Sequence, residues 1–598
     1  MKTADCVFEV SQEVCNKVGG IYQVLKSKAY YMSREYGEKY HTLGPYNAES
    51  AKIEFEEQEP PEEVKKAFSR LERKGIRCRW GIWLIGGRPK TILLEPTALK
   101  SQVNEIKKNL WEKYQVDSIR SDQMFNDSVV WSTSAGMFLE ELMKEEKFKK
   151  LKCVAHFHEW LAGGALLYLK KNKVRIGTVF TTHATTLGRT IVSSNEDLYR
   201  MIEEGKDGEE NLRRAGRFDI SAKHTTELAC ARECDVLTTV SKVTAREVRF
   251  ILGREPDILT LNGIDFEKYP GLEDLTILRR KNRMQMRDFL IAYFSRYYEM
   301  DFYNIRSMFI SGRYEFHNKG IDLFIEALGK LNEKMKKDQT DKTVIVFFWI
   351  PKETRGEDFQ VLKNKALYEE LHDHVAEYLP EVEDMMIGHL VKGEIPKDLI
   401  SDEFMQTCKK LAAHFTEKRG QSPPLCAYQL ATPEDDDQII RAFKQNQLLN
   451  RKEDKVKVIF YPSYLSPADR LISLDYNEAT ITCDVGVFPS YYEPWGYTPL
   501  ETIAQGSLAI TTDCAGFGKF IEGRGRGVHV LKIEGRRWED IVEDLAKKLY
   551  EIANLTKNEL SERRINAKML STHADWGDFV KNYIVAHDLA VEKAFRSR

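Results

Sequence analysis

The feature that most constrains the fold of this chain is the regular alternation of short apolar runs with longer amphipathic segments. The runs are rich in Val, Ile and Phe, which is typical of parallel strands covered on both faces. They lie at residues 154–157, 177–182, 236–240, 307–312, 343–350, 456–460, 485–489 and 507–511. The alternation predicts an α/β fold with parallel sheets, in which functional groups gather at the carboxyl ends of the strands.

The 598 residues are too many for one compact core, because a domain holds about 100–200 residues. The first strand–helix series ends near residues 262–265, and the second opens at Ser307. A charged, helix-like stretch at 271–303 separates them. We therefore expect an N-terminal lobe at 1–280, a C-terminal lobe at 281–574 and a ligand crevice between the two.

A segment at about 355–443 interrupts the second series with two apolar stripes at helical spacing. The stripes are Leu367, Leu371, Val375 and Tyr378, then Phe404, Cys408, Leu411, Ala412 and Phe415. Two interpretations remain open. The segment is either an insertion packed on its own lobe or a projecting pair of helices that joins subunits.

The composition argues against several classes of protein. The 90 basic and 92 acidic residues leave a net charge of −2, which argues against a nucleic-acid binder driven by bulk charge. The 10 cysteines contain no C-x-x-C pair, so neither a disulfide framework nor a zinc ribbon is expected. No apolar run approaches the roughly 18 residues of a membrane span, and the N-terminus lacks the apolar core of a signal peptide. We expect a cytoplasmic protein without a nucleic-acid or membrane partner.

The densest cluster of chemistry is the segment 490–501, SYYEPWGYTPLE, which follows one of the predicted strands. Thr498 is expected to cap a helix, with Glu501 three residues later completing a capping box. Gly496 lets the backbone approach a ligand, and the amides from Gly496 to Thr498 suit a diphosphate at the helix end. Glu493 precedes a proline, so we expect it outside the helix and pointing into the crevice.

Two further clusters suit phosphate groups. Arg313 and Lys319 lie on one loop after the strand at 307–312, where they can hold both phosphates of a nucleotide-sugar and neutralise the leaving diphosphate. Taken alone, they also fit a solvated loop with ordinary surface cations. Gly19 and Gly20 stand at the start of a helix and suit phosphate contact from the opposite lobe, although a glycine pair is more often a turn.

Histidines mark the ends of two predicted strands in the first lobe. His156 and His158 end one strand, and we interpret them as structural histidines. His183 and Arg189 follow the next strand, where His183 can contact sugar hydroxyls and Arg189 can meet phosphate or sugar. No Asp-x-Asp motif stands at these strand ends, so no metal ion is expected.

Together these segments resemble glycogen synthase of the eukaryotic type (glycosyltransferase family 3), a retaining family built from two Rossmann-like lobes in the GT-B architecture. The resemblance covers residues 8–21, 156–163, 181–189, 238–241, 261–263, 312–320, 487–501 and 575–595. The stretch FPSYYEPWGYTP is highly specific for that family. The resemblance implies transfer of glucose from UDP-glucose to the non-reducing end of an α-1,4-glucan, with no metal and no cofactor.

The resemblance also implies roles for single residues. The catalytic set is Glu493, Arg313, Lys319 and His183. The substrate- and nucleotide-binding set is Lys17, Gly19, Gly20, Arg189, Tyr464, Tyr476, Trp495, Gly496, Tyr497, Thr498 and Glu501. Within it, Glu501 is expected on the ribose hydroxyls, and Tyr476 and Tyr464 about the uracil. Tyr464 stands where a phenylalanine is usual.

Two expectations about larger segments follow from the resemblance. Residues 575–598 are expected to form a helix that crosses back to the N-terminal lobe, and the inserted helices resemble the family's oligomer-forming coiled coil, which implies a homotetramer. Two departures concern regulation. The region 562–568 holds fewer arginines than the family's glucose 6-phosphate sensor, and the long terminal tails are missing. A short, bacterial- or archaeal-like form without that control is expected.

Other functions are compatible with the same residues. A UDP-sugar 2-epimerase-like isomerase uses a similar two-lobe architecture and diphosphate site. A non-catalytic regulator that binds nucleotide-sugar or glucan is the other alternative. ADP-glucose is chemically near to UDP-glucose as a donor, and a same-face reaction and a covalent intermediate both remain open.

Overall fold

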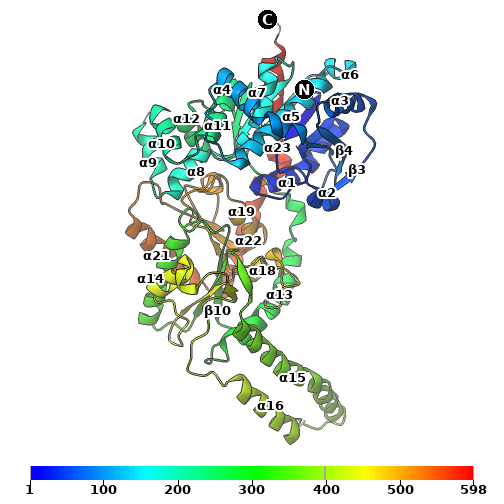
Figure 1. The fold of residues 1–598 in the computed structure, drawn as a ribbon. Helices are drawn as coiled ribbons and strands as arrows, with labels where there is room; N and C mark the ends of the chain where they lie inside the picture. Colours follow the sequence, from blue (N-terminus) through cyan, green and yellow to red (C-terminus); the bar gives the residue numbers. More distant parts are fainter. Residues whose placement is uncertain (1, 206–207, 396–398, 597–598) are drawn as a thin grey trace.

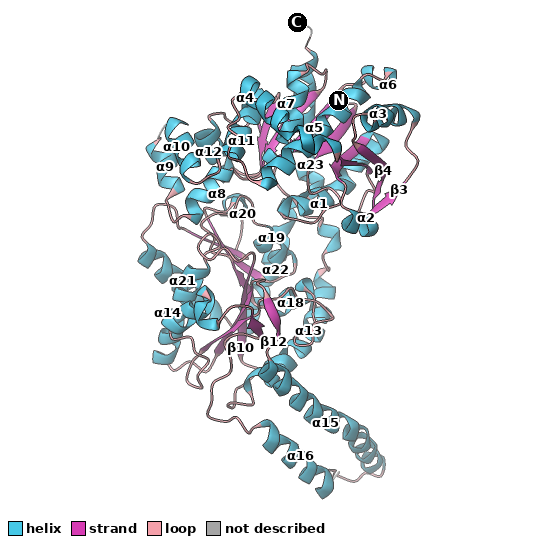
Figure 2. Cartoon of the chain, viewed as in Figure 1, coloured by secondary structure: helices cyan, strands magenta, loops and turns pink. Residues whose placement is uncertain are grey.

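The computed structural model describes residues 2–205, 208–395 and 399–596. Over these residues the chain forms two α/β halves, stacked end to end, with a helical arm leaving the second half (Figure 1). Helices cover both large sheets (Figure 2), which confirms the predicted α/β class with parallel sheets. Among the described helices, none is both long enough and apolar enough to cross a bilayer.

The N-terminal half is built on a sheet that has nine strands among the described residues, in the order β3-β4-β5-β2-β1-β6-β7-β8-β9. The strands are β1 (Cys6–Val10), β2 (Tyr40–Pro45), β3 (Phe55–Glu57), β4 (Arg77–Trp83), β5 (Lys90–Glu95), β6 (Cys153–His158), β7 (Gly177–Thr182), β8 (Val236–Thr239) and β9 (Ile258–Leu259). β4 is antiparallel to β3 and β5, and the remaining neighbours pair in parallel. The central strands β1, β6 and β7 are buried along their whole length, and the apolar runs at 154–157 and 177–182 predict the last two of them.

The C-terminal half is built on a parallel sheet in the order β14-β11-β10-β15-β16-β17. The strands are β10 (Ile305–Ser311), β11 (Thr343–Trp349), β14 (Val456–Phe460), β15 (Val485–Val487), β16 (Leu508–Thr512) and β17 (Val528–Leu531). β15 ends two residues before the predicted limit at Pro489, and a proline has no backbone N–H with which to extend a strand ladder.

Helices flank both sheets. Those of the first half are α1 (Gly20–Tyr36), α2 (Ala48–Glu54), α3 (Glu62–Glu72), α4 (Val103–Tyr114), α5 (Gln123–Met143), α6 (Glu146–Lys149), α7 (Glu159–Lys171), α8 (Thr186–Ser193), α9 (Leu198–Glu204), α10 (Gly208–Arg217), α11 (Ser221–Glu233) and α12 (Lys242–Leu252). Those of the second are α13 (Leu272–Phe294), α14 (Ile321–Lys337), α17 (Gln438–Gln445), α18 (Tyr476–Thr482), α19 (Tyr497–Ala504), α20 (Gly516–Ile521), α21 (Trp538–Asn554) and α22 (Lys557–Ser571). α13 fills the strandless stretch between the two series, runs unbroken through residue 280 and packs on α18.

The last helix, α23 (Trp576–Phe595), returns from the second half to the first (Figure 1). It packs on β6, β7 and β8 and on α1. The Trp576 indole N–H donates to Ser27 Oγ at 2.8 Å, and the Asp588 carboxylate accepts from the backbone of Thr3 and Ala4. Both ends of the chain therefore belong to the N-terminal half.

A pair of helices, α15 (Phe359–Val391) and α16 (Asp402–Phe415), projects away from the body of the molecule (Figure 1). The two helices pack against each other, with the Tyr378 and Phe404 rings stacked at 3.9 Å between centroids. A short antiparallel pair, β12 (Thr354–Glu357) and β13 (Tyr428–Leu430), closes the root of this arm. The structure thus favours a projecting pair of helices over an insertion packed on its own lobe. The joining of subunits by this pair stays a prediction.

Candidate active site

The two halves meet at the carboxyl ends of their parallel strands, and side chains bridge them there. The Asn318 amide donates to Ser193 Oγ at 2.7 Å, and the Tyr492 hydroxyl donates to Glu247 Oε1 at 2.8 Å. Arg246 pairs with Glu534 at 2.6 Å. The edge at which functional groups were expected is therefore also the junction between the halves.

Lys319 and Glu493 form the central ion pair of this junction. Lys319 Nζ lies 2.5 Å from Glu493 Oε2, and both side chains remain partly exposed. The loop that carries Lys319 is held against the strand end by Gly320, which has φ of +64°. A Cβ at residue 320 would lie 2.0 Å from the carbonyl oxygen of Pro489, so a glycine is required for this close approach.

Arg313 reaches across to the glycine pair of the first half. A Cβ built on Gly19 would lie 3.1 Å from Arg313 Nη2 and 2.8 Å from Glu13 Oε1. Glu13 Oε2 accepts from the backbone N–H of Gly19 at 2.8 Å and of Tyr22 at 2.7 Å. Burial raises the pKa of Glu13, while those two hydrogen bonds and the charge of Arg313 oppose the rise. Amides that were expected to face a phosphate thus already hold a carboxylate, and Lys17 stands exposed on the same loop.

The helix after Glu493 begins earlier than the sequence predicts. α19 starts at Tyr497, with Gly496 as its N-cap at φ of +110°. The prediction of Thr498 as N-cap and of Glu501 in a capping box is therefore wrong, because the left-handed glycine turns the chain into the helix two residues sooner. No side chain among the described residues caps this helix, so its first-turn amides are available to an anion.

Glu501 and Tyr476 lie together behind this helix start. Burial raises the pKa of Glu501 to about 7, and burial together with the charge of Glu501 raises the pKa values of Tyr476 and Tyr269. The Tyr476 hydroxyl lies 3.0 Å from Ser311 Oγ at the end of β10. Tyr464, by contrast, is 82% exposed on the loop before α18.

Trp495 belongs to an aromatic cluster rather than to an open surface. Its side chain is 3% exposed and packs on Phe517, Phe520 and Phe579, at 5.7–6.1 Å between ring centroids. This cluster joins α20 to α23. The structure therefore places the Trp495 indole in the packing that supports the Glu493 segment.

Buried carboxylates fix the backbone of the loop that carries His183. Glu159 accepts from the N–H of His183 at 2.7 Å, Glu247 from the N–H of Thr185 at 2.9 Å, and Glu227 from the N–H of Thr186 at 3.0 Å. Burial raises the pKa of each of these carboxyls, that of Glu159 to about 7. Glu159 has φ of +63°, an unfavourable conformation for a residue with a side chain.

Arg189 lies between the halves. Its guanidinium is 3.9 Å from Glu315 Oε1 and 5.9 Å from the centre of the Tyr492 ring. Burial lowers the pKa of Arg189, but Tyr492, Glu315, Glu159 and Glu493 together raise it above its ordinary value. The field of Glu493 thus reaches Arg189, as the shared placement at the strand ends predicts.

Several of these functional neighbours were not identified from the sequence. Glu159 directly follows His158 at a strand end, so its position was a usable signal. Glu13 stands six residues before the glycine pair, within a segment that was singled out without a role for it. Glu247 lies in the middle of α12 and Glu227 in α11, and nothing in their local pattern distinguishes them from surface glutamates.

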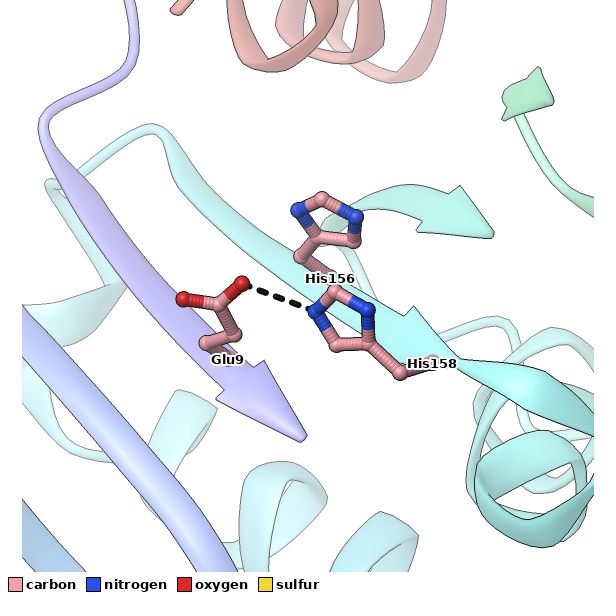
Figure 3. Close-up of side chains that lie close together, drawn as sticks. All are labelled: Glu9, His156 and His158. Carbon is pink, nitrogen blue, oxygen red and sulfur yellow. Dashed lines mark hydrogen bonds and ion pairs between the residues drawn. The ribbon is translucent and has the colours of Figure 1, made fainter. Parts of the chain in front are cut away.

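The cluster of Glu9, His156 and His158 has metal-like spacing, with its ligand atoms within 4.8 Å of one another (Figure 3). Glu9 Oε1 already accepts from His158 Nε2 at 2.8 Å and pairs with the Lys28 ammonium. The two His156 nitrogens contact Thr181 Oγ1 at 2.6 Å and His587 Nε2 at 3.1 Å. A cation and hydrogen-bond partners occupy these atoms, so the residues do not fit a metal site.

Two parallel sheets that meet at the carboxyl ends of their strands form the two-lobe architecture of the GT-B class. The catalytic domain of starch synthase IV from Arabidopsis thaliana, solved with ADP and acarbose, shares this fold. It matches with a TM-score of 0.52 over 98% of this chain and 100% of that chain, at 12% identity.

The family model described as glycogen synthase matches residues 9–598. "Glycogen [starch] synthase" of Neurospora crassa is 34% identical over 606 residues, covering 98% of this chain and 84% of that protein. The human liver glycogen [starch] synthase is 33% identical over 98% of this chain and 84% of its own length. The chain belongs to the glycogen synthase family, which confirms the resemblance and the expected class of enzyme. These relatives lend no support to the isomerase or the non-catalytic alternative.

Proposed function

We propose that the chain transfers glucose from UDP-glucose to the non-reducing end of an α-1,4-glucan, with retention at the anomeric carbon. The observation that carries this proposal is the ion pair between Lys319 and Glu493 at the junction of the halves, with Arg313 reaching across the same junction. A transferase of this kind must stabilise a departing diphosphate and a developing sugar cation together.

Residues of the second half would stabilise the leaving diphosphate. Arg313 and Lys319 would neutralise the diphosphate, and the uncapped start of α19 at Gly496, Tyr497 and Thr498 would add backbone N–H donors and the helix dipole. On the nucleoside side, Glu501 would accept from the ribose hydroxyls. Tyr476 and Tyr464 are proposed to enclose the uracil, and Trp495 to support the Glu493 segment through its packing on Phe517, Phe520 and Phe579.

Residues at the junction of the two halves would bind the hexose and stabilise its developing positive charge. Glu493 would lie beside the anomeric centre and stabilise the positive charge that develops there. His183, with its backbone held by Glu159, and Arg189 would contact the hexose from the first half. The loop with Lys17, Gly19 and Gly20 would close over the phosphates, and exclusion of water would suppress hydrolysis of the donor.

Two properties of the molecule complete the proposal. The arm formed by α15 and α16 exposes apolar side chains, including Leu379, Ile387 and Leu390, which would pair copies of the chain into a homotetramer. A cytoplasmic location accords with the cysteines, since all 10 are free thiols.

Transfer of radiolabel from UDP-glucose to a glycogen primer tests the proposed reaction. Wild-type protein is expected to label the polymer, and Arg313→Ala, Lys319→Ala and Glu493→Gln are each expected to lower kcat by about 10²–10³-fold. Arg537→Ala, at an exposed ion pair with Asp540 outside the junction, is the matched control and should keep wild-type rates. Unlabelled polymer with wild-type protein would reject the proposal.

Donor choice is tested separately. With UDP-glucose and ADP-glucose at equal concentration, the protein is expected to incorporate glucose chiefly from UDP-glucose. Preferential incorporation from ADP-glucose would agree with the proposed transferase activity but would show that UDP-glucose is not the preferred donor.

A further inference from the structure

A hydrogen-bonded chain of buried side chains runs from the first strand to His183. Glu9, on β1, contacts His158 at the end of β6, as Figure 3 shows, with 2.8 Å between Oε1 and Nε2. The other ring nitrogen of His158, Nδ1, lies 2.9 Å from His183 Nε2. Glu9 and His158 are essentially inaccessible to solvent, whereas His183 keeps 9% exposure.

The donor and acceptor roles along this chain follow from its first member. An ionised carboxylate can only accept hydrogen bonds, so His158 must donate from Nε2 to Glu9. A neutral imidazole then has a lone pair at Nδ1, and His183 must donate its Nε2–H to it. The second nitrogen of His183, Nδ1, is left as an acceptor. It has no hydrogen-bond partner among the described residues and is not sealed from solvent.

The surroundings keep the protonation states in place. Burial would raise the pKa of Glu9, but the charge of Lys28 and the hydrogen bond from His158 hold it well below its usual range. Tyr40 donates to the second oxygen of Glu9. Burial lowers the pKa values of both His158 and His183, so both rings stay neutral near pH 7.

The orientation of the His158 ring is also fixed. The His156 ring stacks on it at 4.5 Å between centroids, and the nitrogens of His156 are themselves held by Thr181 and His587. The backbone N–H of His183 donates to Glu159, which fixes the backbone from which the His183 side chain extends.

We propose that Glu9 and His158 are positioning residues that hold His183 as its Nε2–H tautomer, so that Nδ1 accepts a hydrogen bond from a hydroxyl group of the hexose. The identity of the ligand rests on the proposed function. The tautomer of His183 does not, because it follows from contacts within the protein. Residues that never touch the sugar would thereby select a hydroxyl donor at this point of the site.

The tautomer is measured directly by ¹⁵N NMR of the histidine-labelled full chain at pH 7, with the His183 signals assigned by their loss in His183→Asn. The expected result is a protonated Nε2 and an unprotonated Nδ1 at His183. A proton on Nδ1, or on both nitrogens, in the wild-type protein would overturn the proposal, whatever the enzymatic activity proves to be.

Variants of His158 test whether this residue sets the tautomer of His183. His158→Phe keeps a planar ring but removes both the donor to Glu9 and the acceptor for His183, so the His183 signals should shift toward a mixture of tautomers and kcat/KM for UDP-glucose should fall about tenfold. His224→Gln, at another fully buried histidine, is the control and should leave the His183 signals unchanged. Circular dichroism melts establish that each variant is folded. An unchanged His183 tautomer in folded His158→Phe would refute the role of His158.

The hydroxyl is tested with the four monodeoxy analogues of UDP-glucose. One analogue should lose kcat/KM about tenfold with wild-type protein and show no such loss with His158→Phe. Equal losses with both proteins for every analogue would contradict acceptance of a sugar hydroxyl by His183.

Discussion

At the scale of single residues, the site depends on carboxyl groups that burial has made weak acids. Glu501 and Glu159 each have a pKa of about 7, although they serve different partners. Burial raises the pKa of both carboxyls. The backbone N–H groups that donate to Glu159 oppose the rise there, whereas no such hydrogen bond opposes it at Glu501 among the described residues. A ligand that donates hydroxyl groups to Glu501 would favour its charged form and lower its pKa.

Binding of uridine diphosphate at pH 7 is therefore expected to release a fraction of a proton from Glu501. The release should vanish by about pH 9, where the carboxyl is already ionised, because that is about two units above its pKa. Isothermal titration calorimetry in buffers of different ionisation enthalpy measures this quantity. Glu501→Gln should reduce the release, and equal proton release by both proteins at pH 7 would show that another group is responsible.

Gly320 is the residue at which backbone geometry sets the site most directly. Gly320→Ala is expected to lower the free energy of unfolding by about 3–5 kcal/mol, because the new methyl group meets the Pro489 carbonyl in addition to the strain of a positive φ. Gly253→Ala is the matched control, with φ of +67° and open space around the added Cβ, and should cost about 1–2 kcal/mol. Urea denaturation distinguishes them, and equal losses would show that the close approach to Pro489 is not needed.

Local rules placed some residues close together, and they failed where the tertiary structure overrode them; the roles of the site residues stay predictions. Glu493 and Lys319 were placed by the position of their segments after strands, and they do meet. Thr498 satisfied the rules for a helix cap, but the left-handed conformation of Gly496 starts the helix earlier. The carboxylate at Glu247 acts on a loop some sixty residues away in the sequence, and no local pattern reports such a contact.

At the scale of elements, the central strands were predicted well because burial on both faces leaves a continuous apolar run, as in β7 and β14. β15 was predicted too long because an apolar run does not report where strand pairing stops. The return of α23 to the first half was expected from the family resemblance alone, because an amphipathic pattern does not indicate which sheet the helix covers.

The helical arm carries an element-scale prediction. The double variant Leu379→Glu, Ile387→Glu is expected to reduce the mass in solution from a tetramer to a smaller species, because these side chains are 57% and 52% exposed within one chain. Size-exclusion chromatography with light scattering measures the mass. Ile119→Glu, at an exposed residue of the body, should leave the mass unchanged. A monomeric wild-type protein would contradict this account of the arm.

At the scale of the whole molecule, the junction joins the halves through the same segments that carry the proposed catalytic residues. Tyr492 neighbours Glu493, and Asn318 neighbours Lys319. The contacts that hold the halves together, to Glu247 and Ser193, therefore also set the separation of the proposed catalytic groups. A change in a bridging contact should then affect turnover as well as stability.

Tyr492→Phe tests this coupling. Loss of its hydroxyl deprives the buried Glu247 of a donor, which should cost about 1–3 kcal/mol of stability and lower kcat about tenfold. Tyr168→Phe removes a comparable hydroxyl, bonded to Glu140 at 2.7 Å within the first half, and should leave kcat unchanged. Initial rates of both variants measure kcat. Equal kcat values for the two variants would argue that the contacts between the halves do not affect turnover.

The most direct test of the central claim is a structure of the protein with uridine diphosphate bound. We predict that the guanidinium of Arg313 and the ammonium of Lys319 lie within about 3 Å of phosphate oxygens, with Lys319 shared between the diphosphate and Glu493. A bound diphosphate that contacts neither of these side chains would contradict the account.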